Sequence, residues 1–317
     1  MNLKKYFLTA ILISALISPM FYSKDASACA CGCGVLNVGT SSLIPNCEGG
    51  TAFLQYDYLN QNRNWQGSNK SDANNNDDKQ IKSQVITAGM QYMFNRDWGM
   101  AARVPYMNRQ VKMTEVDEDS GEEMAKSTRV NSLGDVRING IYTGFSSDMS
   151  TGLTFGLKLP TGQSKAKSID SRDMQIGTGT TDWLLGAYHF GKIDNLGKLN
   201  WFAQGNWQHA FAGHNGYRPG DEVSGATGLS YNAGSFLGIK KVAPIMQITG
   251  SRKAHDTGWA SDPQNSGYTH GYFAPAIELT FGKFRTYADI EFPIYQKTNG
   301  NQLVPSRIYK MILAYNF

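Results

Sequence analysis

The chain ends in the stretch "RIYKMILAYNF" (307–317), in which apolar and other residues take turns. One side of an extended segment would carry Tyr309, Met311, Leu313, Tyr315 and Phe317, and the other would carry Lys310, Ala314 and Asn316. A period of two indicates a β-strand with one apolar face. Such a strand, closing on a terminal Phe in an exported chain, is typical of the last strand of an outer-membrane β-barrel.

The opposite end of the chain predicts export. Two lysines precede an apolar stretch over residues 6–22, and small residues precede Cys29, as in a secretory signal peptide. An uncleaved membrane anchor is the alternative, but Pro19 interrupts a stretch that is already short for a bilayer. We therefore predict a signal peptide over 1–28, a Cys-rich periplasmic segment over 29–49 and an outer-membrane barrel over 50–317.

Composition narrows the class of protein. The 317 residues carry a net charge of +4, and charged residues make up 18%, below the roughly 25% of soluble domains. After the N-terminus no apolar run is long enough to cross a membrane as a helix, whereas barrel strands hide half of their residues from lipid. The small net charge gives no argument for a nucleic-acid partner.

Alternation recurs along the chain and predicts an all-β, antiparallel up-and-down transmembrane barrel of about twelve strands. The predicted strands are 51–59, 84–94, 98–111, 129–145, 150–159, 181–190, 198–209, 221–232, 239–252, 270–281, 285–295 and 307–317. Short joints (95–97, 146–148, 193–197, 233–237, 282–284) take turns with long polar ones (60–83, 112–128, 160–180, 210–220, 253–269, 297–306). A soluble β-sandwich would also alternate, but it has no reason to keep this rhythm, which a barrel with short periplasmic turns and long outer loops requires.

Inward positions of this barrel carry charges. The predicted lumen-lining residues are Asp57, Arg103, Arg109, Asp135, Arg137, Lys158, Glu278, Asp289, Glu291 and Lys310. Basic residues dominate the strands from 98 to 159 and acidic ones the first and the late strands, with Asp135 and Lys310 breaking the segregation. Two interpretations stay open: a transverse field across a passage, or side chains that reach across and pair, plugging a narrow lumen.

All four cysteines, Cys29, Cys31, Cys33 and Cys47, precede the first predicted strand. Alternate-residue cysteines cannot pair with each other comfortably, because a disulfide requires a specific geometry. Three interpretations compete: structural disulfides such as Cys33 with Cys47, a soft-metal site for Cu or Zn with four thiolates, and lipid attachment at Cys29. No other cofactor is expected.

Four segments, "GDVRINGIYTGF" from Gly134, "GLKLPTG" from Gly156, "QIGTGTTDWLLGAYH" from Gln175 and "YRPGDE" from Tyr217, resemble a known family in its usual order. It is the transporter-like outer-membrane family named after the meta-pathway of phenol degradation. The resemblance covers roughly residue 40 to the C-terminus. It implies a barrel of about twelve strands with a transport role, often for small hydrophobic or aromatic compounds, and it does not imply phenol as the solute.

No enzyme motif is found: the sequence lacks His-Glu-x-x-His, Gly-x-Ser-x-Gly, a phosphate-binding Gly-rich Lys motif and a His followed two residues later by Ser. We therefore predict a channel or transporter that passes small molecules across the outer membrane of a Gram-negative bacterium. The alternative is a metal-binding protein that uses the Cys cluster, with the barrel as its anchor. Expected partners are outer-membrane lipid, the small-molecule solute and the barrel-assembly machinery, which would read the strand that ends in Phe317.

Overall fold

The computed structural model describes residues 43–45, 48–72, 79–116, 122–166, 175–211 and 213–317. The predicted signal peptide and all four cysteines lie outside these residues. Within them, no helix is long and apolar enough to cross a membrane.

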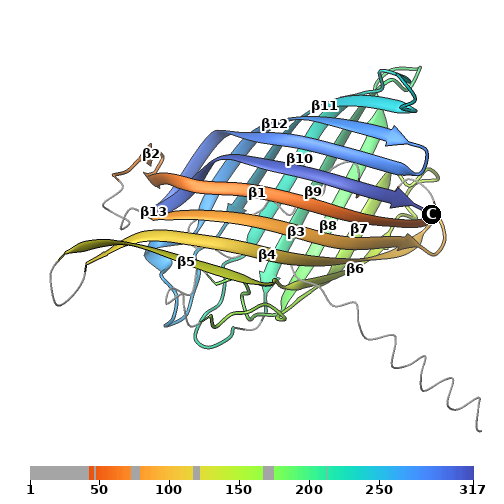
Figure 1. Ribbon diagram of the computed structural model, residues 1–317. Helices are drawn as coiled ribbons and strands as arrows, with labels where there is room; N and C mark the ends of the chain where they lie inside the picture. The colour runs from red at the N-terminus through yellow and green to blue at the C-terminus, as the bar shows by residue number, and fades with distance from the viewer. Residues whose placement is uncertain (1–42, 46–47, 73–78, 117–121, 167–174, 212) are drawn as a thin grey trace, which may run out of the picture.

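The described chain is built from β-strands and one 3-10 turn (Figure 1). The elements are β1 (Gly49–Gly67), β2 (Asn69–Lys70), β3 (Gln80–Met93), β4 (Trp98–Val116), β5 (Glu123–Leu133), β6 (Val136–Tyr142), β7 (Thr151–Leu159), β8 (Asp182–Lys192), β9 (Leu199–Ala210), β10 (Glu222–Tyr231), β11 (Lys241–Lys253), η4 (Pro263–Asn265), β12 (Tyr268–Phe281) and β13 (Phe284–Asn316). Sequence neighbours pair antiparallel around the wall, and β13 closes it by pairing with β1. The predicted antiparallel barrel is confirmed.

Eleven elements form the closed wall, and β2 and β5 lie outside it. The long β13 contributes two passes, because its first part pairs antiparallel with β12 up to Thr298 and its second part pairs antiparallel with β1 from Thr298 to Asn316. A turn at Gly300, which has φ of 65°, lies close to the point where the partner changes. The wall is therefore crossed about twelve times, as the alternation of apolar residues predicted.

Three predicted outer loops are in large part strand, which corrects the sequence-based boundaries. β1 continues to Gly67, β4 runs on to Val116, and the expected loop at 297–306 lies within β13. Above the apolar zone, outward positions carry Asn, Gln and Lys, so the alternation of apolar residues fades while the backbone pairing continues. The alternation follows the apolar outer face, whereas backbone hydrogen bonds between strands do not depend on that face.

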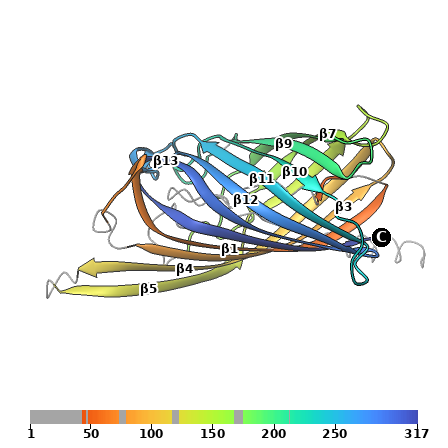
Figure 2. The ribbon, with the colours of Figure 1, turned by 90° about the horizontal axis from the view of Figure 1, so that it is seen from above.

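The predicted strand 129–145 is interrupted, which is a second correction. β4 pairs with β5 along its outer part and with β6 along its inner part, and Gly134 and Asp135 separate the two. The β4–β5 hairpin extends well beyond the other strands (Figure 2). The break turns Asp135 into the barrel, where its side chain is fully buried.

The outer face of the wall is apolar and aromatic. Near the short turns it exposes Phe94, Trp98, Phe145, Phe281, Phe284, Tyr315 and Phe317, and ring contacts join several neighbours, such as Trp98 with Tyr142 at 4.7 Å between centroids. Further along the strands it exposes aliphatic residues, and then Trp183 and Phe211, whose rings lie 5.5 Å apart. Aromatic girdles around an apolar band are the features with which a barrel meets a bilayer.

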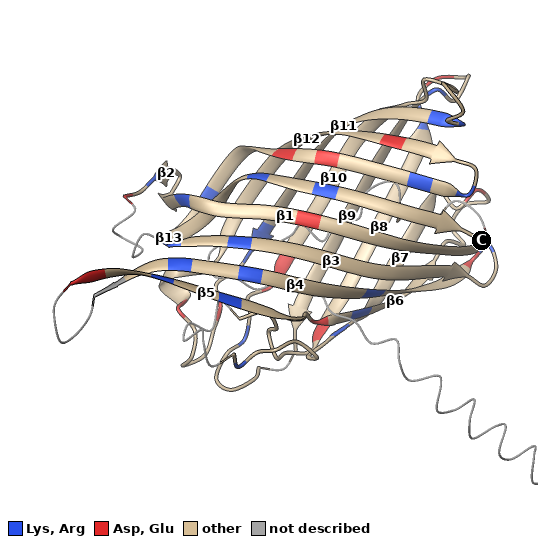
Figure 3. Ribbon diagram, viewed as in Figure 1, with Lys and Arg blue, Asp and Glu red and all other residues tan. Residues whose placement is uncertain are grey.

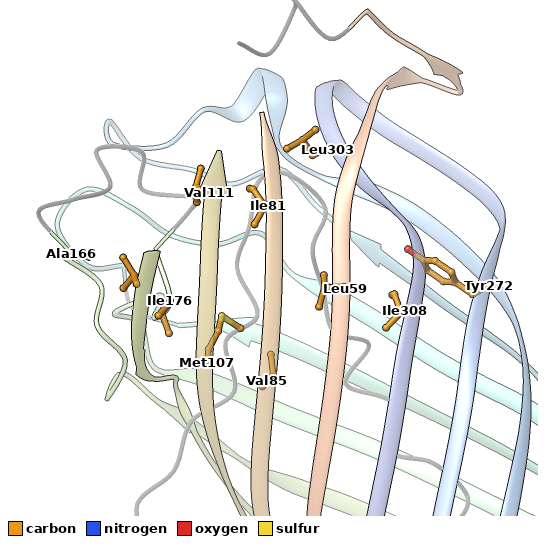
Figure 4. Close-up of a cluster of buried hydrophobic side chains, with 11 residues drawn as sticks. Leu59, Ile81, Val85, Met107, Val111, Ala166, Ile176, Tyr272, Leu303 and Ile308 are labelled. Atoms are coloured by element: carbon orange, nitrogen blue, oxygen red, sulfur yellow. The ribbon is translucent and has the colours of Figure 1, made fainter. Parts of the chain in front are cut away.

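Two apolar clusters fill parts of the interior. The first lies toward the long loops and contains Leu59, Ile81, Val85, Met107, Val111, Val130, Ala166, Ile176, Tyr272, Leu303 and Ile308 (Figure 4). The second lies toward the short turns and contains Leu43, Phe53, Phe202, Ala226, Ile245, Tyr287, Ile312 and Ala314. Polar and charged side chains, among them Lys158 and Lys310, occupy much of the remaining interior.

Candidate functional site in the barrel interior

A short segment before β1 enters the barrel. Leu43 and Ile44 are 8% and 9% exposed, and Leu43 packs in the apolar cluster near the short turns. The same cluster contains inward side chains of strands that are far from this segment in sequence, among them Phe202 and Ile245. The segment therefore occupies the interior at the end where the C-terminus lies.

A cavity of about 90 Å³ lies between this segment and the wall made by β3, β4 and β6 to β10. Its polar lining consists of Gln91, Arg103, Arg137, Asn139, Thr154, Gln204, Asn206, Gln208, Glu222 and Ser224. Its apolar lining includes Leu43, Ile44, Ile141, Leu184 and Tyr188. The cavity thus offers hydrogen-bond donors and acceptors, including basic and acidic side chains, beside an apolar surface.

One wall of the interior holds a buried network centred on Lys158. The Nζ atom of Lys158 lies 2.7 Å from a carboxylate oxygen of Asp182 and 3.6 Å from one of Asp135. Lys158 also donates to Thr178, which in turn donates its hydroxyl to Asp135 at 2.7 Å. All these side chains are buried, so the pairing takes place away from water.

The network continues to the cavity. Gln208 donates to Asp182 from its amide nitrogen, and its oxygen accepts a 2.7 Å hydrogen bond from Arg137. Nearby, the hydroxyl of Tyr268 donates to Glu222 at 3.2 Å. The chain from Lys158 to Arg137 therefore fixes the orientation of a guanidinium that lines the cavity.

A second network lies on β1, β11 and β13. Lys310 donates to Glu291 at 3.2 Å, and Lys310 is the register neighbour of Asp57 on β1. Asp289 accepts from Tyr287 at 2.6 Å and from Gln247 at 3.3 Å. Three carboxylates thus surround one ammonium group, which leaves this part of the interior acidic.

The remaining predicted lumen residues also face inward, with their own local partners. Arg109 donates to the carbonyl of Gln175 at 3.1 Å, and Glu278 pairs with the half-exposed Lys241 at 3.2 Å. Arg103 is partly exposed and lines the cavity. Of the ten predicted residues, the structure buries all but Arg103.

The structure joins these charges in a way that neither sequence-based interpretation foresaw. Basic and acidic groups pair locally within each part of the wall. Asp135 pairs with Lys158, and Lys310 pairs with Glu291. The segment 175–181 adds Thr178 and Thr180 to the Lys158 network, and Gly162 and Thr178 donate their backbone N–H groups to Asp135. The described parts of this loop therefore fold against the inner wall of the barrel.

Sequence reasoning missed Asp182, Glu222, Lys253 and Asp256. Lys253 and Asp256 pair at 2.7 Å, and both are buried near the long-loop end. Asp182 and Glu222 are the first residues of β8 and β10. The available signal was parity, because each of them alternates with an apolar residue on the outer face, Trp183 or Val223.

In the described part of the chain, no group of three or more His, Cys, Asp or Glu residues is arranged to hold a metal ion. The predicted Cu or Zn ligands Cys29, Cys31, Cys33 and Cys47 lie outside that part. Their role stays a prediction.

No known family model matches the sequence, and no curated protein matches it. The fold is similar to that of an outer-membrane channel from Pseudomonas putida F1, with a TM-score of 0.64 and 12% identity over 88% of this chain and 100% of that one. This chain shares the closed-barrel fold of that structure. More distant likenesses are a FadL homologue from Pseudomonas aeruginosa (TM-score 0.45, 9% identity, 93% and 98% covered) and the toluene transporter TodX from P. putida (0.43, 10%, 94% and 99%).

Proposed function

We propose that the protein is an outer-membrane channel that passes small molecules across the membrane without covalent chemistry. The observation that carries this proposal is the cavity inside a closed barrel, lined by Arg103, Arg137 and Glu222 beside Ile141 and Tyr188. The apolar outer band with aromatic girdles supports insertion into a bilayer. The shared fold with a P. putida outer-membrane channel supports the same membrane for this chain.

The lining favours small solutes that combine an apolar body with a polar group. Apolar contact comes from Ile141, Leu184 and Tyr188. The polar contact comes from the guanidinium of Arg137 and the amide of Gln208, which are hydrogen-bonded to each other and oriented by the Lys158 network. A small aromatic molecule with a hydroxyl or carboxylate group has both features. The apolar side chains of Leu43 and Ile44 narrow the route, so passage requires this segment to move.

The C-terminal strand supports assembly into the outer membrane. Phe317 exchanges two backbone hydrogen bonds with Gly50, at 2.9 and 3.0 Å, which completes the closure between the first and last strands. Its ring is half exposed on the outer face, where the barrel-assembly machinery would read it before closure. In the orientation that we propose, the short turns face the periplasm, and residues 29–49 would lie on that side.

Liposome swelling with the purified full-length protein tests the channel, using sugars, aromatic acids and metal complexes as solutes. The matched pair of variants is Ser224→Trp and Val223→Trp: Ser224 lines the cavity, and its neighbour Val223 is 56% exposed on the outer face. We expect S224W to slow uptake of the solutes that the wild type passes and V223W to leave it unchanged.

Equal uptake by S224W and the wild type would contradict passage through this cavity. Swelling no faster than in empty liposomes, for every solute, would contradict the channel itself. Deleting residues 29–33 distinguishes the channel from the alternative, a metal-binding protein. Solute uptake should survive the deletion if the barrel is the functional part. Loss of uptake on deletion would favour the metal-binding role.

A further inference from the structure

A row of cations crosses the outer face of the barrel near its long-loop end. Register pairs Asn60 of β1 with Lys82 of β3, Lys82 with Gln110 of β4, and Gln110 with Arg129 of β5. On the other side of β1, Ile308 of β13 is the register partner of Leu59, so Arg307 lies next to Asn60. We call Arg307, Asn60, Lys82, Gln110 and Arg129 the basic row.

The side chains of the basic row point away from the interior. On each strand they alternate with buried residues: Leu59, Ile81, Val111, Val130 and Ile308 are at most 6% exposed. Arg129 and Arg307 are exposed, and Lys82 is partly exposed. Figure 3 shows basic residues on β3 and β5, and further ones on β4 between them, where these strands run side by side.

The level of the row on the barrel is set by the apolar residues beneath it. The same strands expose Tyr309, Ile86, Tyr106 and Leu133 just before the row is reached. Along β4 the outward stretch from Trp98 to Tyr106 spans about 27 Å, and a tilted stretch of this length covers most of the roughly 25 Å apolar band of such barrels. The row therefore lies where lipid headgroups begin.

The positive charge of the row is not compensated by the chain. Within the described residues, none of Lys82, Arg129 and Arg307 forms an ion pair with a carboxylate, and the same holds for Lys112, which follows Gln110 on the outward side of β4. Arg307 is held over the ring of Phe292, with its guanidinium carbon 5.4 Å from the ring centroid. Its donors are therefore oriented on the surface and left available to a partner.

The spacing of the row is regular. The three cations lie on alternate strands, which places them about 10 Å apart, since neighbouring strands are roughly 4.8 Å apart. Asn60 and Gln110 supply amide donors between them. Cations separated by amides match a lipid with more than one phosphate better than they match a single carboxylate or an apolar protein surface.

We propose that the basic row binds the phosphate groups of a phosphorylated glycolipid in the outer leaflet. The proposal rests on the membrane position inferred under the proposed function. Charge complementarity at the headgroup level selects an anionic lipid, and the number and spacing of the cations select a lipid with two phosphates. The bound lipid would hold β13, β1, β3 and β5 together at the place where the β4–β5 hairpin leaves the wall.

Native mass spectrometry of the purified full-length protein tests this binding, with bisphosphorylated lipid A as the probe. The test variant is K82Q/R129Q/R307Q, and the matched control is K192Q/K198Q/K240Q, which removes three exposed lysines near the short turns. At about 1 kcal/mol per cation near the surface, we expect the row variant to bind lipid A at least about tenfold more weakly. The control variant should bind as the wild type does.

Two further lipids define the partner. Dephosphorylated lipid A should bind the wild type and the row variant equally and weakly, and phosphatidylglycerol should not displace bisphosphorylated lipid A from the wild type. Undiminished lipid A binding by the row variant, or equal competition by phosphatidylglycerol, would overturn the proposal. Heat-modifiable migration in gels confirms that each variant is folded, and liposome swelling distinguishes the two proposals, because a variant that loses lipid A should still pass solutes.

Discussion

Lys158 and Asp182, on the adjacent strands β7 and β8, form an ion pair of 2.7 Å in which neither side chain exposes more than 1% of its surface. Asp135 lies on the other side of the same ammonium group, at 3.6 Å. Two carboxylates sharing one buried cation are held by the hydroxyls of Thr178 and Thr180, so the interior network and the inward-folded outer loop depend on each other.

Replacing Lys158 with Met should destabilise the barrel by about 3–5 kcal/mol, because Asp135 and Asp182 would remain buried without their cation. The measurement is the free energy of unfolding in urea, in detergent micelles. Arg96→Met is the control: it removes a surface pair with Asp97 in which the two side chains are 52% and 39% exposed, and such pairs contribute little to stability. A D135N/K158M/D182N variant should recover much of the lost stability, and failure to do so would argue against buried charge as the cause.

Gly156 of β7 has no room for a side chain. A Cβ atom added there would lie 2.0 Å from the carbonyl oxygen of Ile138 on β6, whereas one added at Gly205 of β9 would meet nothing closer than 3.8 Å. We expect Gly156→Ala to lower the free energy of unfolding by about 1–3 kcal/mol, as overpacking does. Gly205→Ala should leave it nearly unchanged. Equal stability of the two variants, measured by the same urea titration, would contradict the close packing of β6 on β7.

Removing the apolar segment from the interior should open the route. Leu43 and Ile44 are buried against the inner wall and line the cavity, so L43D/I44D would place carboxylates among apolar side chains and expel the segment. We expect faster liposome swelling and larger single-channel conductance than in the wild type. The exposed pair Leu196 and Leu237, at the short turns, supplies the control L196D/L237D, which should conduct like the wild type.

The turn between β8 and β9 should be sensitive to acid. Hydrogen bonding to the backbone N–H of Leu199 lowers the pKa of Asp194 below its ordinary value of 3.8. A lowered pKa means that the carboxylate stabilises the folded state above about pH 4, and that this contribution is lost as pH falls through the folded-state pKa. Unfolding of Asp194→Asn should therefore show a smaller drop in stability between pH 6 and pH 3 than the wild type. An identical drop in both proteins would exclude this carboxylate as a contributor.

Much of the fold could be predicted from alternation. Tyr309 to Phe317 and most of the other predicted segments carry apolar residues at alternate positions, since one side of each strand lies on the apolar outer face. The prediction failed where that cause is absent: Asn60, Lys82 and Lys112 lie beyond the apolar band, so the outer parts of β1, β3 and β4 carry no alternating apolar signal, although their backbones stay paired.

The interior was predicted less completely. Parity placed Lys158 and Lys310 on inward positions, and the structure buries both. It did not show that Asp182 would be the main partner of Lys158, because a partner depends on register, and register depends on turn geometry as well as on the two strand sequences. The entry of Leu43 carries no periodic signal at all.

Local chain chemistry was thus sufficient for the class of fold, the approximate number of strands and the side of most strands that lies on the outer face, because each of these follows from the spacing of apolar residues along one segment. The pairing of Lys158 with Asp182, the inward folding of 175–181, the Leu43 segment inside the barrel and the alignment of Lys82 with Arg129 depend on which strands become neighbours. Those contacts join residues distant in the chain, and barrel closure alone brings them within reach of one another.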